Sequence, residues 1–163
     1  MAQLADTLIV IDLQNALQDC YDFNNLIEKT NLRIQSYRKE NRPIIFIQHH
    51  DQDLIKGSED WQLFDGLDFK KSDLFSEKAH ANAFYHTDLQ QILQSHNLQA
   101  LEICGAQTNY CCNATIIMAH GLGYKITMGH NMTTTTDNDY LDTTSTISFF
   151  ENIWNHRFLS FVE

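Results

Sequence analysis

The 163-residue sequence is short of positive charge, of proline and of long apolar runs. Its 11 Lys and Arg stand against 21 Asp and Glu, a formal net charge of −10, which argues against nucleic acid or an anionic membrane as a partner because phosphates attract cations. No apolar run approaches the length of a membrane span. With one proline and 43% hydrophobic residues the composition is that of an ordinary globular protein, and we expect one domain over residues 1–163.

Cysteine is also scarce. The four cysteines, Cys20, Cys104, Cys111 and Cys112, form neither a CxxC pair nor a zinc framework. Free thiols are typical of a reducing compartment. The chain also begins without the basic region, long apolar segment and cleavage site of a signal peptide, so we expect a cytoplasmic protein.

The apolar residues that are present alternate between two kinds of pattern along the chain. Continuous apolar runs predict buried strands at residues 8–11, 44–47, 74–76, 100–104, 124–128 and 158–162. Helical spacing predicts helices at residues 23–38, from a Thr87-x-x-Gln90 capping box, after Cys111 and around residues 147–154. This alternation implies βαβ units, and hence a three-layer α/β/α, Rossmann-like fold with about six mainly parallel strands and helices on both faces.

Polar residues follow four of the predicted strands: Asp12, Gln48 to Asp51, Lys78, and Gly105 to Cys111. Ligands of parallel sheets bind at the carboxyl ends of strands, so we expect these groups to converge. The sequence has no GxGxxG or GxxxxGK[ST] phosphate loop and no GxSxG elbow. Residues 51–73 and 133–139 are predicted as polar loops, and a loop as long as the first is typical of a functional or interaction surface.

A carboxylate, a lysine and a cysteine at one sheet edge suffice for covalent acyl transfer. Asp12 would take the thiol proton, Lys78 would favour the thiolate, and backbone N–H groups would hold the oxyanion. At the first turn of a helix, the helix dipole would lower the pKa of Cys111. Taken singly, each residue also has a structural interpretation: Asp12 as a turn cap, Lys78 as a solvated side chain, and Cys111 or Cys112 as inert core.

Three motifs in order resemble those of the isochorismatase-like cysteine hydrolase family, which includes nicotinamidases and N-carbamoylsarcosine amidases. The resemblance runs from about residue 6 to residue 136. The motifs are the opening strand with Asp12-x-Gln14, then Glu77-Lys78 with Asn82-Ala83-Phe84 and Thr87-x-Leu89, then Gly105-x-x-Thr108-x-x-Cys111 with Ala114-Thr115. The resemblance implies a hydrolase that cleaves a small amide or related carbonyl compound through a thioester on Cys111.

The resemblance also implies roles for individual residues. The catalytic triad would be Asp12, Lys78 and Cys111. A cis peptide between Ala106 and Gln107 would turn the N–H groups of Gln107 and Cys111 towards one point as an oxyanion hole. The substrate pocket would be lined by Gln14, Gln48, His49, Trp61, Phe84 and Tyr110. Two alternatives stay open, namely a catalytically silent binding or assembly module on the same scaffold and a thiol redox protein.

Family members that use zinc carry more histidines in the second loop than this chain does. His49 and Asp51 are the only candidates for metal ligands that we identify there, and zinc normally needs three or four, so we expect neither zinc nor another cofactor. The expected partner is a small-molecule substrate, whose identity the sequence does not reveal. The resemblance further implies a homo-oligomer, a dimer or a tetramer.

Overall fold

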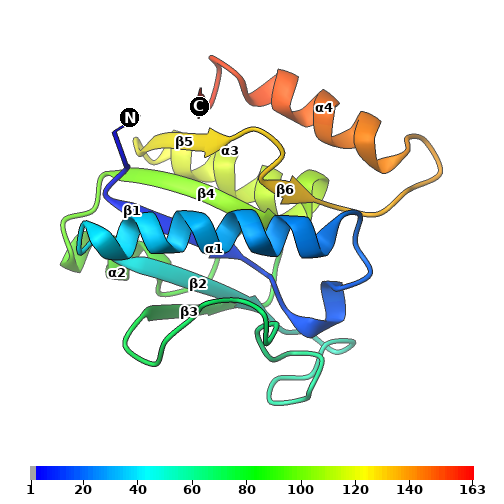
Figure 1. Ribbon diagram of the computed structural model, residues 1–163, viewed down its shortest axis with the longest axis horizontal. Coiled ribbons are helices and arrows are strands. Elements are labelled where there is room, and N and C mark those ends of the chain that lie inside the picture. Colours follow the sequence, from blue (N-terminus) through cyan, green and yellow to red (C-terminus); the bar gives the residue numbers. More distant parts are fainter. Residues whose placement is uncertain (1–2) are drawn as a thin grey trace.

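Seven parallel strands form one sheet in the computed structural model, which describes residues 3–163. The strands run in the order β3-β2-β1-β4-β5-β7, and β6 pairs with the end of β4. They are β1 (Thr7–Ile11), β2 (Ile44–His49), β3 (Leu74–Lys78), β4 (Ala100–Ala106), β5 (Lys125–Gly129), β6 (Thr133–Thr134) and β7 (Ser160–Val162). The predicted parallel sheet is confirmed, with one strand more than the predicted six (Figure 1).

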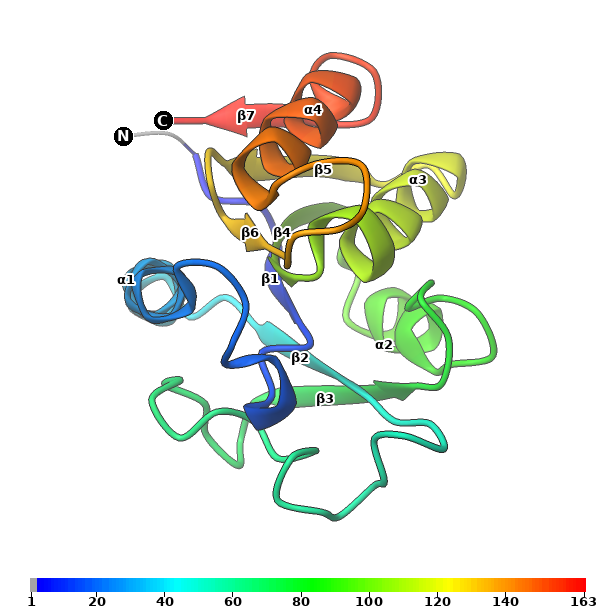
Figure 2. The same ribbon diagram turned by 90° about the vertical axis from the view of Figure 1, so that its right-hand side faces the viewer.

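Helices cover both faces of this sheet. Helix α1 lies on one face, while α2 and α3 lie on the other, as Figure 2 shows. The helices are α1 (Phe23–Lys39), α2 (Leu89–Ser95), α3 (Asn113–Gly121) and α4 (Thr143–Trp154), with a short 3-10 turn η1 (Asn15–Leu17) and a π-helical turn η2 (Thr108–Cys112). The predicted three-layer α/β/α architecture is therefore confirmed. None of the helices in residues 3–163 is long and apolar enough to cross a membrane.

The central strands are mainly apolar because both of their faces are covered. Every residue of β1 is buried, as are the first five residues of β2. On the α1 side, Phe23, Leu26, Ile27, Ile34 and Tyr37 repeat at helical spacing and are buried together with Thr30, while Asn24 and Glu28 face solvent. Burial of these apolar side chains stabilises the sheet at which the polar strand ends meet.

Two local predictions were wrong. Residues 133–139 were predicted as loop, but Thr133 and Thr134 form β6 because β5 pairs only with the first half of β4 and leaves Gly105 and Ala106 free for another strand. The capping box was also wrong. Helix α2 begins at Leu89, and the Thr87 hydroxyl accepts a hydrogen bond from the N–H of Leu89 at 3.3 Å in a local turn.

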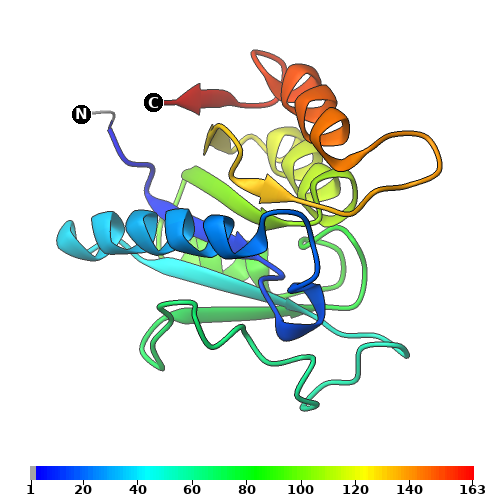
Figure 3. The ribbon, with the colours of Figure 1, turned by 45° about the vertical axis from the view of Figure 1, so that its right-hand side comes forward.

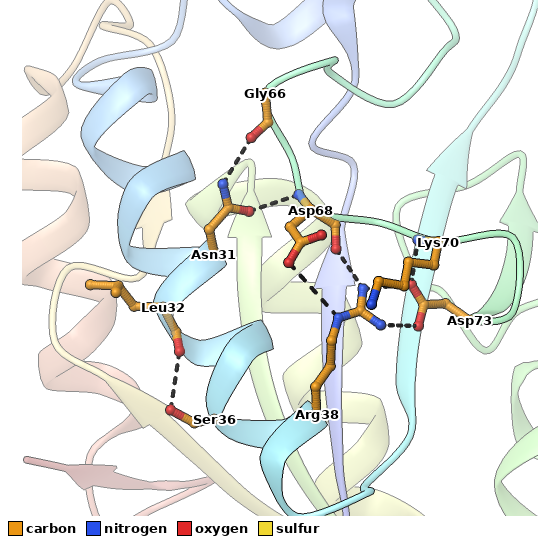
Figure 4. Close-up of polar contacts among 8 residues, drawn as sticks. All are labelled: Asn31, Leu32, Ser36, Arg38, Gly66, Asp68, Lys70 and Asp73. Carbon is orange, nitrogen blue, oxygen red and sulfur yellow. Dashed lines mark hydrogen bonds and ion pairs between the residues drawn. The ribbon is translucent and has the colours of Figure 1, made fainter.

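Residues 51–73 contain no helix or strand, as predicted, and the second half of this loop is fastened to α1. The Arg38 guanidinium donates two hydrogen bonds to the Asp73 carboxylate, at 2.9 and 3.0 Å, and one to the backbone oxygen of Asp68 (Figure 4). The Asn31 side chain bonds both Gly66 and Asp68, at 2.8 Å each. The first half of the loop instead passes beside η1, near the carboxyl ends of the strands (Figure 3).

Candidate active site

The polar residues predicted to converge do meet at the carboxyl edge of the sheet. Asp12 directly follows β1, His49 and Lys78 end β2 and β3, and Gln107 follows β4. His49 and Lys78 are direct neighbours across the parallel pair. The strand order reverses between β1 and β4, so the site lies at the switch point where open α/β sheets bind their ligands.

The buried ammonium of Lys78 is the centre of the site. Its Nζ lies 2.8 Å from Asp12 Oδ2, 3.1 Å from Cys111 Sγ and 3.0 Å from His49 Nδ1. Lys78 stands two strands away from Asp12, and its four-carbon stem spans that gap while only 1% of the residue is exposed. The structure thus brings together the three residues predicted as a triad.

Asp12 offers the thiol an available oxygen. Its backbone takes a left-handed φ of 52°, which Asp tolerates better than most residues do, and its N–H donates to Ile47 O at 3.0 Å. Oδ2 is occupied by Lys78, whereas Oδ1 is buried without a hydrogen-bond partner among the described residues. Oδ1 is therefore a vacant acceptor, and Asp12 is close enough to Cys111 for each residue to affect the pKa of the other.

Cys111 was predicted to stand in the first turn of an α-helix, and this prediction was wrong. It lies in the π-helical turn η2, and α3 begins two residues later at Asn113. In this turn the carbonyl of Gln107 accepts hydrogen bonds from the N–H groups of Tyr110 and Cys112, at 3.2 and 3.1 Å. The peptide bond between Ala106 and Gln107 is cis, as the resemblance implies.

The pKa of Cys111 is also the reverse of the prediction. Burial, with the negative charge of Asp12, raises the thiol pKa to about 11, although the Lys78 ammonium acts in the opposite direction. Burial likewise raises the pKa of Asp12, which makes this carboxylate a stronger base. Burial opposes the charge on Lys78, but the negative charge of Asp12 and, once it forms, that of the Cys111 thiolate keep the pKa of Lys78 above its ordinary value. Cys111 is therefore a protonated thiol at rest.

This pKa predicts the pH dependence of thiol labelling. Alkylation of Cys111 by iodoacetamide should be slow at neutral pH and should rise roughly tenfold for each pH unit between about 7 and 10, because only the thiolate reacts. Intact-mass and peptide mass spectrometry would measure the rate at this residue. A rate that is already level at neutral pH would show a resting thiolate instead.

A cavity of about 170 Å³ opens beside the thiol. It is lined by Asp12, Gln14, Leu17, His49, Leu54, Gln107, Tyr110 and Cys111. Leu17 comes from η1 and Leu54 from the long loop, and sequence reasoning missed both because no motif marks them. Their only signal was a position shortly after a strand end.

Three residues predicted for the pocket do not line this cavity. Gln48 points to the loop, where its side-chain amide donates to Trp61 O at 3.1 Å. Trp61 contributes that backbone oxygen and also accepts from Gln14 Nε2 at 2.8 Å. Phe84 stacks on Tyr124, with ring centroids 5.8 Å apart. Of the three aromatic residues predicted for the pocket, Tyr110 alone lines this cavity.

Gln14 lines the cavity and also fixes its rim. Its Nε2 donates to His49 O at 3.0 Å, and its Oε1 accepts from His49 N at 2.8 Å. These bonds join the ends of β1 and β2 to the long loop through Trp61. Gln14 therefore holds the positions of both neighbouring strand ends.

The residues considered as metal ligands do not fit a zinc ion. Both ring nitrogens of His49 are engaged, Nδ1 with Lys78 and Nε2 with Asp51 Oδ2 at 2.8 Å. The Lys78 ammonium would repel a cation bound there. Within residues 3–163 no three His, Cys, Asp or Glu side chains gather in a metal-binding arrangement.

The fold and the site together define an α/β protein that presents a cysteine thiol beside a buried aspartate–lysine pair at the switch point of a parallel sheet. Comparison with known proteins is consistent with this class. The Isochorismatase domain family matches residues 6–152. A solved structure described as an isochorismatase family protein is 43% identical, with a TM-score of 0.95, over 96% of this chain and 97% of its own. The chain belongs to the isochorismatase family.

Two further relatives carry more specific descriptions. The ureidoacrylate amidohydrolase RutB of Klebsiella pneumoniae is 29% identical over 118 residues, which are 71% of this chain and 48% of that protein. This chain thus matches about half the length of that curated relative. The pyrazinamidase of Pyrococcus horikoshii, solved in complex with zinc, is 17% identical with a TM-score of 0.84, over 96% of this chain and 98% of its own. At that identity the likeness is one of fold.

Proposed function

We propose that this protein is a cysteine hydrolase that cleaves a small carboxamide, or a related carbonyl compound, through a thioester on Cys111. The observation that carries the proposal is the buried ammonium of Lys78, which contacts both Asp12 and Cys111 beside a small cavity. Burying a charged group is costly unless it is paired or has a function, and here Asp12, whose Oδ1 has no partner among the described residues, lines the same cavity as Cys111. The amidohydrolase relative supports the same chemistry.

The first half of the reaction forms the thioester. Asp12 Oδ1 accepts the proton of Cys111 as the sulfur attacks the carbonyl carbon, and Lys78 stabilises the developing thiolate. The N–H groups of Gln107 and Cys111, both residues of the cavity wall, hold the oxyanion. The tetrahedral intermediate collapses when the C–N bond breaks, and ammonia or an amine leaves with the proton from Asp12.

The second half restores the enzyme. Asp12 takes a proton from a water molecule as the oxygen of that water attacks the thioester carbon. The C–S bond breaks, the acid leaves, and the proton held by Asp12 returns to the sulfur of Cys111. No step requires a metal, because the carboxylate, the ammonium and the backbone N–H groups supply the charge stabilisation.

The other two interpretations have less support. A silent binding module gives no reason for an aspartate that is 2% exposed and a lysine that is 1% exposed at the thiol. A redox protein needs a second thiol that exchanges with the first, but Cys112 is fully buried, and burial raises the pKa of its thiol far above the ordinary value. Both observations favour acyl transfer.

The setting of the enzyme completes the proposal. All four cysteines are free, which fits a reducing cytoplasm. Ile117, Met118 and Leu122 on or next to α3 and Phe149 on α4 are exposed apolar side chains, and such surfaces support a dimer or tetramer of this chain. We place the whole of residues 1–163 in one hydrolase domain.

Trapping the intermediate tests the proposal. The protein is incubated with nicotinamide and with carbamoyl and ureido compounds, quenched in acid and weighed by mass spectrometry. We expect a mass increase equal to the acyl group on Cys111 and a release of ammonia. Protein whose Cys111 has first been alkylated is the control, and undiminished ammonia release from it would contradict the proposal.

A further inference from the structure

The third contact of the Lys78 ammonium goes to a residue outside the triad. His49 Nδ1 lies 3.0 Å from Lys78 Nζ, and the two residues face each other across β2 and β3. An ammonium has three hydrogens and accepts nothing, so the three contacts of Lys78 use all of its donors. His49 must therefore offer a lone pair at Nδ1 if the lysine is to be held in place.

The opposite side of the imidazole ring is held by Asp51. His49 Nε2 lies 2.8 Å from Asp51 Oδ2, while Asp51 Oδ1 accepts hydrogen bonds from the N–H groups of Asp53 and Leu54 at 2.9 and 2.8 Å. The bonds from His49 and from this turn lower the pKa of the Asp51 carboxyl to about 2. Asp51 is thus an ionised carboxylate that can only accept at Nε2.

These two contacts select one form of the ring. If Nδ1 carried a hydrogen, as in the other neutral tautomer or in imidazolium, that N–H would point at the Lys78 ammonium only 3.0 Å away. With the hydrogen on Nε2, the ring donates to Asp51 and accepts from Lys78, so both hydrogen bonds are satisfied. The positive charge of Lys78 at Nδ1 and the negative charge of Asp51 at Nε2 both favour this arrangement, while Asp12 is paired with the same Lys78 ammonium.

We propose that Asp51 and His49 form a positioning pair, in which Asp51 fixes the tautomer of His49 and His49 holds the Lys78 ammonium against Asp12 and Cys111. His49 lines the cavity wall, but in this role it acts on the reaction through the lysine. The kinetic consequence rests on the proposed amide hydrolysis, whereas the tautomer and the state of the lysine do not.

The same carboxylate connects the pair to the pocket wall. Through Oδ1, Asp51 fixes the turn that carries Leu54, which lines the cavity. Through Oδ2, it fixes the ring that holds the lysine. The first part of the long loop therefore sets both one wall of the pocket and the position of Lys78.

Asp51→Asn separates these two tasks. The Asn oxygen must take the place of Oδ1 to keep the hydrogen bonds from Asp53 and Leu54, which leaves the amide NH₂ facing His49. A donor at that place forces Nε2 to accept, so the ring hydrogen moves to Nδ1 and points at Lys78. The turn stays intact while the hold on the lysine is lost, just as changing a ring's carboxylate partner to an amide alters the tautomer in serine proteases.

Three variants of the histidines complete the set. His49→Asn puts an amide oxygen close to the place of Nδ1 and should keep the contact with Lys78. His49→Leu has a similar volume but no acceptor and should lose that contact. His50→Asn is the matched control, because His50 is the neighbouring residue and its side chain is neither in the cavity wall nor hydrogen-bonded to any described residue.

Three measurements test the pair. Long-range proton–nitrogen NMR of the ring of His49, assigned by its absence in His49→Asn, should show the Nε2–H tautomer in the native protein and the Nδ1–H tautomer in Asp51→Asn. Alkylation of Cys111 should be several-fold slower in Asp51→Asn and His49→Leu, because a displaced Lys78 stabilises the thiolate less. Hydrolysis should show kcat lower by about 10- to 100-fold in both variants with KM little changed, a clearly smaller loss in His49→Asn, whose amide oxygen restores the contact with Lys78, and native values in His50→Asn.

The outcomes distinguish failure of the pair from failure of the proposed function. An Nδ1–H tautomer in the native protein, an unchanged tautomer in Asp51→Asn, or native labelling and turnover in His49→Leu would overturn the positioning pair. If the native protein hydrolyses no amide, the proposed function fails. The tautomer and the labelling rate of Cys111 would then still decide whether His49 holds Lys78.

Discussion

Cys111→Ala is expected to abolish amide hydrolysis, with a loss of at least about 10⁴-fold, while the free energy of unfolding changes by no more than about 1 kcal/mol. Without the sulfur no thioester forms. The ion pair of Asp12 and Lys78 in the small cavity remains, but it supplies no nucleophile other than water. The stability change is small because the residue is only partly buried and alanine keeps the backbone of η2. Initial rates and denaturant unfolding of the same preparation measure both quantities.

Cys112→Ala is the matched control for that result. Its side chain is 0% exposed and packs in the core, so we expect the opposite pattern: a loss of roughly 1 to 2 kcal/mol in stability and turnover within a few-fold of native. If Cys111→Ala kept its activity while Cys112→Ala lost it, the nucleophile would be the second cysteine. If both remained active, the reaction would not proceed through a thioester on either cysteine.

The parts of the molecule that the sequence predicted well depend on local patterns. Buried parallel strands are continuous apolar runs, so β1 and β2 and the order of strands and helices could be deduced residue by residue. The convergence of Asp12, Lys78 and Cys111 followed from their places after strands. These features are encoded by neighbours in the sequence.

The parts that were missed depend on contacts between distant segments. Strand β6 exists because β4 has two residues that β5 leaves unpaired. The pKa of Cys111 is raised because burial outweighs Lys78, and the degree of burial is not visible in the motif. The contact of His49 with Lys78 arises from the register of β2 against β3, and a shift by one residue would have turned His49 away.

Gly105→Ala is expected to destabilise the fold by roughly 3 to 5 kcal/mol, a large part of the stability of a typical domain. Gly105 has a φ of +131°, a conformation that side chains disfavour, and a Cβ built there would lie 2.1 Å from the backbone oxygen of Ile11. Backbone atoms of a central strand cannot move aside as a flexible side chain can. The midpoint of denaturant unfolding, compared with the native protein, measures the loss.

Gly121→Ala provides the control, because this glycine lies at the end of α3 with no atom within 4 Å of an added Cβ. Alanine there should be neutral or stabilising by up to about 1 kcal/mol, since it favours the helix. Gly105 pairs with Ile11, the residue before Asp12, and precedes Ala106, so the close approach that requires glycine also sets the distance between Asp12 and the turn that carries Cys111. We therefore expect the Gly105→Ala variant, when it is folded under stabilising conditions, to hydrolyse amides more slowly than Gly121→Ala. Equal stability and equal rates in the two variants would show that the close approach of β1 to β4 does not position the site.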